Sequence, residues 1–152
     1  MPGTTTNLKI PYPLASDRLA DYPTTARTAA QVLEAHLAPT TARVTAYTGW
    51  EIDTASAGTV TSLGRLHTLP LAIRRTDKSF RTGVGALFQL ISLPAGVTPP
   101  PLDWQMLGML AVGSFTQPLV WRANTQAIHV VPTSTYTVDV DTWCYGTATW
   151  IA

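Results

Sequence analysis

Two pairs of carboxylates are the residues of this chain whose types and spacing are best suited to chemistry. Glu51 and Asp53 stand two positions apart, and so do Asp139 and Asp141. Side chains at i and i+2 of a β-strand share one face, so each pair would present two carboxylates together. Such a pair could bind a calcium ion or hydrolyse a glycosidic bond. A solvated strand face that discourages edge pairing is the simpler interpretation, and we favour it.

The other reactive side chains are isolated in the sequence. His36, His67 and His129 lie far apart, and none has the spacing of a metal site or of a nucleophile with its base. The single cysteine, Cys144, cannot form an intramolecular disulfide and is expected to be a small buried hydrophobe. We therefore expect no catalytic residue, no bound metal and no cofactor.

Tryptophan and tyrosine are the remaining candidates for binding. The five tryptophans all lie in or beside segments with β character, and burial in the core is expected for most of them. An exposed aromatic ring on a β domain could stack on a sugar, but the sequence does not indicate which ring would do so. The tryptophans are Trp50, Trp104, Trp121, Trp143 and Trp150.

The composition favours a compact domain with extensive subunit contact. The 152 residues are 45% hydrophobic, only 12% charged, and include 25 threonines, with a net charge of +1. A surface covered by neutral hydroxyls leaves little repulsion between chains. The basic residues are scattered, so we expect no nucleic-acid partner. No apolar run reaches the length of a membrane helix and no signal peptide is evident, which predicts synthesis in a cytoplasm without membrane insertion.

Residues 1–23 predict an extended anchoring arm. Alternating apolar side chains are separated by prolines that block both a helix and a central strand. Such a segment should dock on another surface, which could belong to its own domain, a sister subunit or a larger particle. The predicted anchoring residues are Leu8, Ile10, Pro11, Tyr12, Pro13 and Leu14.

Residues 24–39 predict a short helical stalk. Thr24 or Thr25 can cap the helix and Pro39 stops it. Its apolar residues follow a 4-3-4 spacing, which is a heptad seam about two heptads long. An isolated helix of this length is marginal in water, so the seam must be covered. It could pack on its own β domain or form a parallel trimeric bundle with copies of itself. The predicted seam is Ala26, Ala30, Leu33 and Leu37.

Residues 43–152 predict a mainly β head domain. Short runs rich in β-branched and aromatic residues are bounded by turn residues, at the spacing of an antiparallel, jelly-roll-like β-sandwich. Residues 123–126 predict the turn of a hairpin. The strands are expected at about 59–66, 69–76, 84–93, 105–112, 118–124, 127–132, 136–140 and 143–151.

Two segments resemble structural proteins of tailed phages. Tyr12-Pro13, Ser16-Asp17 and Ala20-Asp21, followed by an alanine-rich helix, resemble the N-terminal segment of tail-fibre and minor structural proteins of phages that infect actinobacteria. The segment from Leu93 to Pro101, with a predicted strand before it and a predicted hairpin after it, resembles a Leu-Pro-Ala-Gly-x-x-Pro-Pro loop in the C-terminal domains of phage fibres. The chain lacks the long shaft of a full fibre.

The resemblance implies a non-enzymatic virion protein, a short trimeric fibre, spike, head fibre or capsid decoration protein. The arm would attach to a capsid or to a tail or baseplate protein, the helices would form a homotrimeric stalk, and the β head would stand on the virion surface, where it could touch a host glycan. The alternatives are a glycan-degrading enzyme that uses the acidic pairs and a monomeric carbohydrate-binding module.

Overall fold

The computed structural model describes residues 3–5, 9–12, 14 and 22–152. The chain divides into two compact units, Met1–Pro39 and Thr40–Ala152, and each is considered by itself. Leu8 and Pro13 of the predicted anchor lie outside the described residues, as do the Ser-Asp and Ala-Asp pairs of the first resemblance.

The described part of the arm pairs with itself. Strand β1 (Gly3–Thr4) lies antiparallel to β2 (Pro11–Tyr12), with Gly3 opposite Tyr12. Thr5 extends this pairing, because its backbone N–H donates to the carbonyl of Ile10 at 2.9 Å and its hydroxyl accepts from the Ile10 N–H at 2.9 Å. Pro11 fits here because an edge strand tolerates a residue without an N–H. The sequence predicts an extended segment that docks on another surface, and the docking stays a prediction.

The helix of the first unit is α1, Tyr22–Leu37. It begins two residues before the predicted start, with Pro23 in the first turn, where a missing N–H costs nothing. It ends just before Pro39, as expected. Thr25 is its one residue classed as buried among those the structure describes, so most of its surface is open within this unit.

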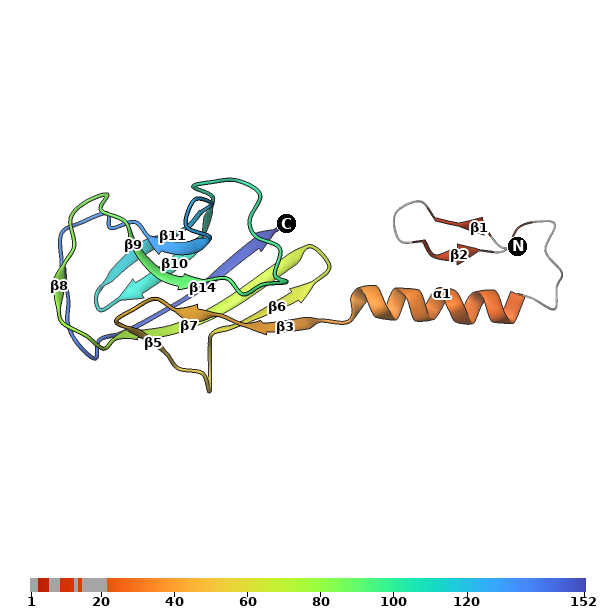
Figure 1. The fold of residues 1–152 in the computed structure, drawn as a ribbon, viewed down its shortest axis with the longest axis horizontal. Coiled ribbons are helices and arrows are strands. Elements are labelled where there is room, and N and C mark those ends of the chain that lie inside the picture. Colours follow the sequence, from red (N-terminus) through yellow and green to blue (C-terminus); the bar gives the residue numbers. More distant parts are fainter. Residues whose placement is uncertain (1–2, 6–8, 13, 15–21) are drawn as a thin grey trace. The chain divides into compact units, whose positions relative to one another are not determined.

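The second unit is built on one antiparallel sheet of ten strands, which confirms the mainly β prediction (Figure 1). A separate short pair joins β8 (Phe80–Arg81) to β13 (Thr137–Val138). The strands of the large sheet are β3 (Thr40–Arg43), β4 (Thr45–Ala46), β5 (Trp50–Ile52), β6 (Thr59–Leu63), β7 (Leu66–Arg75), β9 (Phe88–Ser92), β10 (Met106–Val112), β11 (Phe115–Arg122), β12 (Ala127–Val130) and β14 (Trp143–Ile151).

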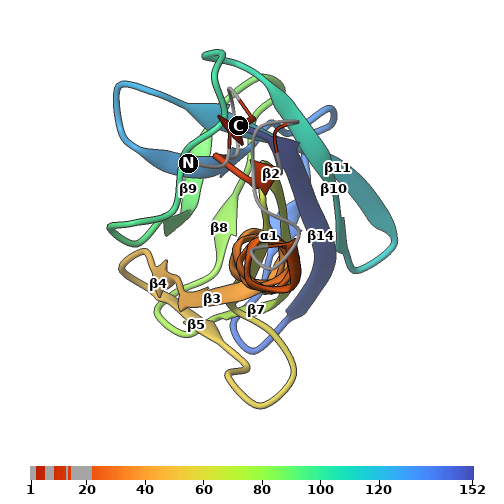
Figure 2. The same cartoon turned by 90° about the vertical axis from the view of Figure 1, so that its right-hand side faces the viewer.

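The sheet nearly closes on itself through a single stretch of chain. Its strand order is β3-β6-β7-β14-β10-β11-β12-β9-β4, with β5 beside β7. The two ends of this order, β3 and β4, are separated along the chain by Val44 alone. Thus one extended segment pairs first with β6 and then with β9, and the strands curve round a common centre (Figure 2). The predicted two-layer jelly-roll sandwich is not confirmed, because the strands form one continuous curved sheet.

Pro70 lies inside the ten-residue strand β7, where a proline would normally break the pairing. Its carbonyl accepts from the Gly58 N–H at 3.0 Å, so the Pro70 nitrogen faces the same side, away from β14. On that side β6 pairs with β7 as far as Thr68, and β5 pairs again from Ile73. The proline therefore falls in the gap between two partners and costs the ladder no hydrogen bond.

The buried hydrophobic residues of most strands of the second unit form one core cluster. Leu69, Leu110 and Ile128 are fully buried on three different strands. Burial of this kind stabilises the fold by about 1.5–3 kcal/mol for each large aliphatic side chain. The largest fully buried side chains are Trp121, Leu69, Ile73, Leu90, Ile91, Leu110, Leu119, Ile128, Gln117, Val60, Val130 and Val138.

Candidate functional site

The predicted seam of α1 is an exposed apolar surface. Leu33 is 39% exposed and Leu37 is 62% exposed, and Ala26 and Ala30 are exposed as well. The spacing of these residues places them along one side of the helix. An exposed leucine is common, but leucines and alanines at heptad spacing form a surface that water covers poorly.

A second apolar surface lies where the arm meets the start of α1. A groove of about 480 Å³ lies there, and Tyr12 at its edge is 45% exposed. Ala26 belongs both to this groove and to the seam. Of the other predicted anchoring residues, Ile10 and Pro11 are half-buried and Leu14 is exposed. The groove is lined by Pro11, Tyr12, Tyr22, Pro23, Thr25, Ala26 and Ala29.

The acidic residues do not form the predicted i, i+2 pairs. Instead Arg74 gathers one acid from each pair, with Glu51 at 2.8 Å and Asp141 at 3.4 Å. All three side chains are substantially exposed. The hydrogen bond with Glu51 raises the pKa of the Arg74 guanidinium. The cluster is an ion-paired surface network in which one cation contacts two carboxylates.

Asp53 is held in a turn just after β5. Its carboxylate accepts hydrogen bonds from the Ser56 hydroxyl at 2.6 Å and the Ala55 N–H at 3.1 Å, and these bonds lower the pKa of Asp53. Asp139 and Asp141 both follow the two-residue strand β13, so no strand places their carboxylates on one face. The sequence spacing misleads here because both strands end before the second acid.

The three histidines and Cys144 differ in their burial. His36 is exposed, whereas His67 and His129 are buried. Burial raises the pKa of the Cys144 thiol to about 11, so the thiol stays protonated at neutral pH and lacks the thiolate that nucleophilic attack requires. Within residues 3–5, 9–12, 14 and 22–152, no group of three His, Cys, Asp or Glu side chains could hold a metal ion.

The second unit has an open hollow of about 450 Å³ beside β9 and the start of β5. Three aromatic rings form its inner wall. Trp50 stacks on Phe88 with ring centroids 5.8 Å apart, and Phe80 meets both rings edge-on. We call this site the Tyr47 hollow. It is lined by Tyr47, Thr48, Trp50, Arg75, Phe80, Leu87, Phe88, Gln89 and His129.

Arg75 holds the inner wall of the Tyr47 hollow together. Its guanidinium lies over the rings of Trp50 and Phe80, at 5.4 Å and 5.2 Å from their centroids. It also donates to the Lys78 carbonyl at 3.1 Å and pairs with Asp77 at 3.4 Å. Because stacking and pairing already engage this cation, its charge is largely compensated within the protein.

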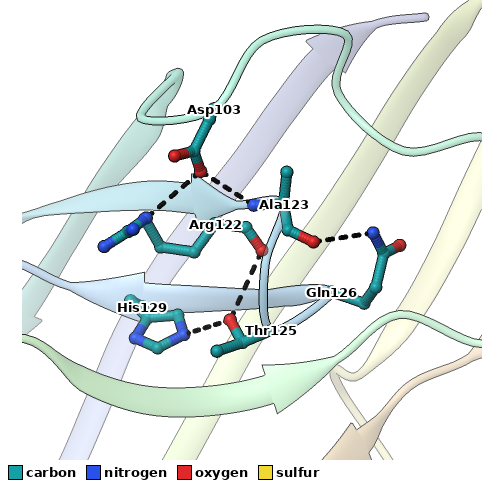
Figure 3. Close-up of polar contacts among 6 residues, drawn as sticks. All are labelled: Asp103, Arg122, Ala123, Thr125, Gln126 and His129. Atoms are coloured by element: carbon teal, nitrogen blue, oxygen red, sulfur yellow. Dashed lines mark hydrogen bonds and ion pairs between the residues drawn. The ribbon is translucent and has the colours of Figure 1, made fainter.

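His129 links the hollow to the β11–β12 hairpin. Its Nε2 forms a 2.8 Å hydrogen bond with the Thr125 hydroxyl, and Asp103 holds Arg122 and the Ala123 N–H at the hairpin turn (Figure 3). Burial and the nearby Arg122 lower the pKa of His129, so the imidazole is neutral at pH 7. Its Nδ1 is buried and has no hydrogen-bond partner among the described residues.

The five tryptophans differ in burial, and the sequence could not show which of them would be exposed. Trp50, Trp121 and Trp150 are buried, Trp143 is half-buried, and Trp104 is 52% exposed with the Arg122 guanidinium 4.1 Å from its ring centroid. Sequence reasoning missed the hollow because its lining comes from four separate segments. Only the aromatic content hinted at such a site.

Comparison with protein-family models, with curated proteins and with solved structures finds no match to this chain. In the described part of the chain, α1 does not have the length and apolar character needed to cross a bilayer.

Proposed function

We propose that this chain is a non-enzymatic structural protein of a tailed-phage virion, displayed on the particle as a homotrimer. It would be a short fibre or spike, or a decoration protein of the capsid. The N-terminal unit would attach it to a capsid, tail or baseplate protein, and the β domain, taken as a compact sandwich-like head, would face outward. The two phage-like segments of the sequence suggest this class of protein.

The main observation that supports a trimer is the exposure of the α1 seam. Leu33 and Leu37 lie on the same helix side and are 39% and 62% exposed. A parallel three-helix bundle would bury both positions from every chain. The small residues Ala26 and Ala30 would let the helices approach closely at the N-terminal end of the seam.

The groove beside the seam supports the anchoring role. It is mostly apolar, and Tyr12 and Tyr22 at its sides are 45% and 38% exposed. An apolar surface of this kind on a free monomer marks a site that another chain covers. In this proposal the covering chain belongs to the particle.

Two measurements test the proposal. Sedimentation of the purified full chain at micromolar concentration should give the mass of a trimer, and antibody labelling should place the protein on the surface of virions. A monomer that is absent from virions would contradict both parts and would favour the carbohydrate-binding module.

Deletion of residues 1–23 should abolish incorporation into virions while the β domain stays folded. Incorporation at full occupancy would contradict the anchoring role.

A further inference from the structure

We propose that the Tyr47 hollow is a binding site for a neutral saccharide. Three features lead to this ligand class: an exposed ring at the entrance, side chains that both donate and accept hydrogen bonds, and a buried imidazole nitrogen that lacks a partner. The hollow of about 450 Å³ lies within the range of about 300–1,000 Å³ for sites that bind small molecules.

Tyr47 supplies an accessible aromatic face. Its side chain is 49% exposed, whereas Trp50 deeper in the hollow is only 8% exposed and has Phe88 stacked on it. Trp50 is therefore part of the wall, and Tyr47 is the ring on which a ligand can lie. The apolar face of a sugar ring suits such a surface, because it carries C–H groups while its hydroxyls point sideways.

The polar lining fits hydroxyl groups. Thr48, Gln89 and the Tyr47 phenol can each donate and accept hydrogen bonds, as a sugar hydroxyl does. Gln89 is half-buried, and its amide donates to the Ser92 hydroxyl at 3.2 Å, which fixes its orientation and leaves its amide oxygen as an acceptor. An exposed aromatic ring beside several groups that both donate and accept hydrogen bonds favours a polyol over a purely apolar ligand.

The charge of the lining favours a neutral sugar. Among the described residues, no carboxylate lines the hollow, and the one cation there, Arg75, is stacked on two rings and paired with Asp77. The Arg75 side chain is only 13% exposed, so little of the guanidinium is left to attract an acidic group. A sugar without a charge therefore gains most here.

His129 provides the observation that points most directly to a ligand. His129 is 8% exposed and borders the hollow, and its Nδ1 lacks a hydrogen-bond partner among the residues that the structure describes. An unpaired buried polar atom is unfavourable and uncommon, and the described residues hold three others, on His67, Gln105 and Tyr136. This nitrogen has less than 1 Å² of accessible surface, so a sugar hydroxyl seated beside Gln89 would reach it only if the bordering side chains shift on binding.

The biological use of this site rests on the proposed function, because a head displayed on a virion would meet host glycans. Binding itself does not depend on that function. It can be measured on the purified full chain, whether the chain is trimeric or not, so failure of one proposal leaves the other standing.

The test is a titration of the isotope-labelled full chain, followed by two-dimensional NMR. The probes are glucose, galactose, mannose, arabinose and N-acetylglucosamine, with glucuronate as an acidic comparison and indole as an apolar one. At least one neutral sugar should give saturable shifts of the backbone amides near Tyr47, Gln89 and His129. If only glucuronate or only indole binds, or if no probe gives saturation, the proposal is wrong.

Three variants locate the binding. Tyr47→Ala should weaken binding about tenfold or more, which corresponds to about 1.4 kcal/mol, and Tyr47→Phe should largely retain it. His129→Gln keeps a polar group for Thr125 but removes Nδ1, and should weaken binding severalfold. Tyr145→Ala is the matched control, because Tyr145 is 57% exposed and lies outside the hollow. Equal effects of Tyr47→Ala and Tyr145→Ala, in variants that keep the wild-type amide spectrum, would overturn the proposed site.

Discussion

The indole nitrogen of Trp150 donates a hydrogen bond to the backbone carbonyl of Thr98 at 2.9 Å. Trp150 lies in β14 and is 2% exposed, whereas Thr98 belongs to the proline-rich loop of residues 93–101. Leu93 and Val97 of the same loop pack against the core. Strand β14 thus fixes the loop of residues 93–101 over the core, and this loop has an architectural role in the fold.

We expect Trp150→Phe to loosen this loop. The variant keeps an aromatic ring but removes the N–H, and it leaves the Thr98 carbonyl without this donor. The free energy of unfolding should fall by about 1–3 kcal/mol, measured by urea denaturation. Hydrogen exchange should speed up within residues 93–101. Trp104→Phe is the control, because Trp104 is 52% exposed and should tolerate the change. Unchanged exchange in the loop would contradict the predicted role of the bond.

Gly146→Ala should disrupt the centre of the sheet. A Cβ at Gly146 would lie 2.4 Å from the Met109 carbonyl oxygen, and backbone atoms of paired strands cannot move apart cheaply. We expect a loss of several kcal/mol or failure to fold, which thermal unfolding would show. Gly83→Ala is the matched control, since its Cβ would meet only the Ala86 side chain at 3.7 Å. Equal melting temperatures for the two variants would contradict the steric argument.

Much of the fold could be predicted from the sequence because its elements have strong local signals. Pro39 marks the end of α1, and the turn of residues 123–126 joins β11 to β12 with Arg122 opposite Ala127. The closure of the sheet could not be predicted. It depends on one short segment around Val44 that pairs with two distant strands, and no local pattern encodes a choice between distant partners.

The candidate site was harder to predict for the same reason. The two acidic pairs were visible in the sequence, but Arg74 recruits one acid from each through tertiary contacts. The Tyr47 hollow depends on the positions of β5, β7, β8, β9 and β12 together. By contrast, the position of the four seam residues on one side of α1 follows from their spacing alone, because heptad spacing is a property of the helix, while their contact with other chains stays a prediction.

The stability of the head should decrease as the pH falls below about 6.5. His67 is 4% exposed, its Nε2 has no hydrogen-bond partner among the described residues, and burial lowers its pKa. An unfolded chain binds a proton near pH 6.5, whereas folded His67 resists it, so acid favours the unfolded state. The stabilisation is complete above pH 6.5 and is lost as the pH falls toward the folded pKa. His129 contributes in the same direction.

Urea denaturation at pH 7.5, 6.5 and 5.5 measures this dependence. Each linked proton changes the free energy of unfolding by at most about 1.4 kcal/mol per pH unit. His67→Gln should flatten the slope. A slope that is equally steep in His67→Gln would show that other groups carry the pH dependence.

The acidic cluster around Arg74 should prove to be structural. Exposed ion pairs contribute little and are screened by salt, so Glu51→Gln and Asp141→Asn should each lower the urea midpoint only slightly, and less so at high salt.

The purified chain should release no soluble sugar from host cell walls. If it does release sugar, and if amide replacement of Glu51, Asp53, Asp139 and Asp141 abolishes the release, the glycan-degrading alternative is correct.

Leu33→Asp should convert the proposed trimer to monomers. In a three-helix bundle the substitution would bring three carboxylates together in an apolar seam, and uncompensated buried charge is strongly unfavourable. The monomer itself should stay folded, because Leu33 is 39% exposed within the single chain. Sedimentation gives the mass, and circular dichroism reports the β domain. Gln31→Asp adds the same charge outside the seam and should leave the trimer intact. A trimer that survives Leu33→Asp would show that contacts between the β heads, and not the helices, hold the chains together.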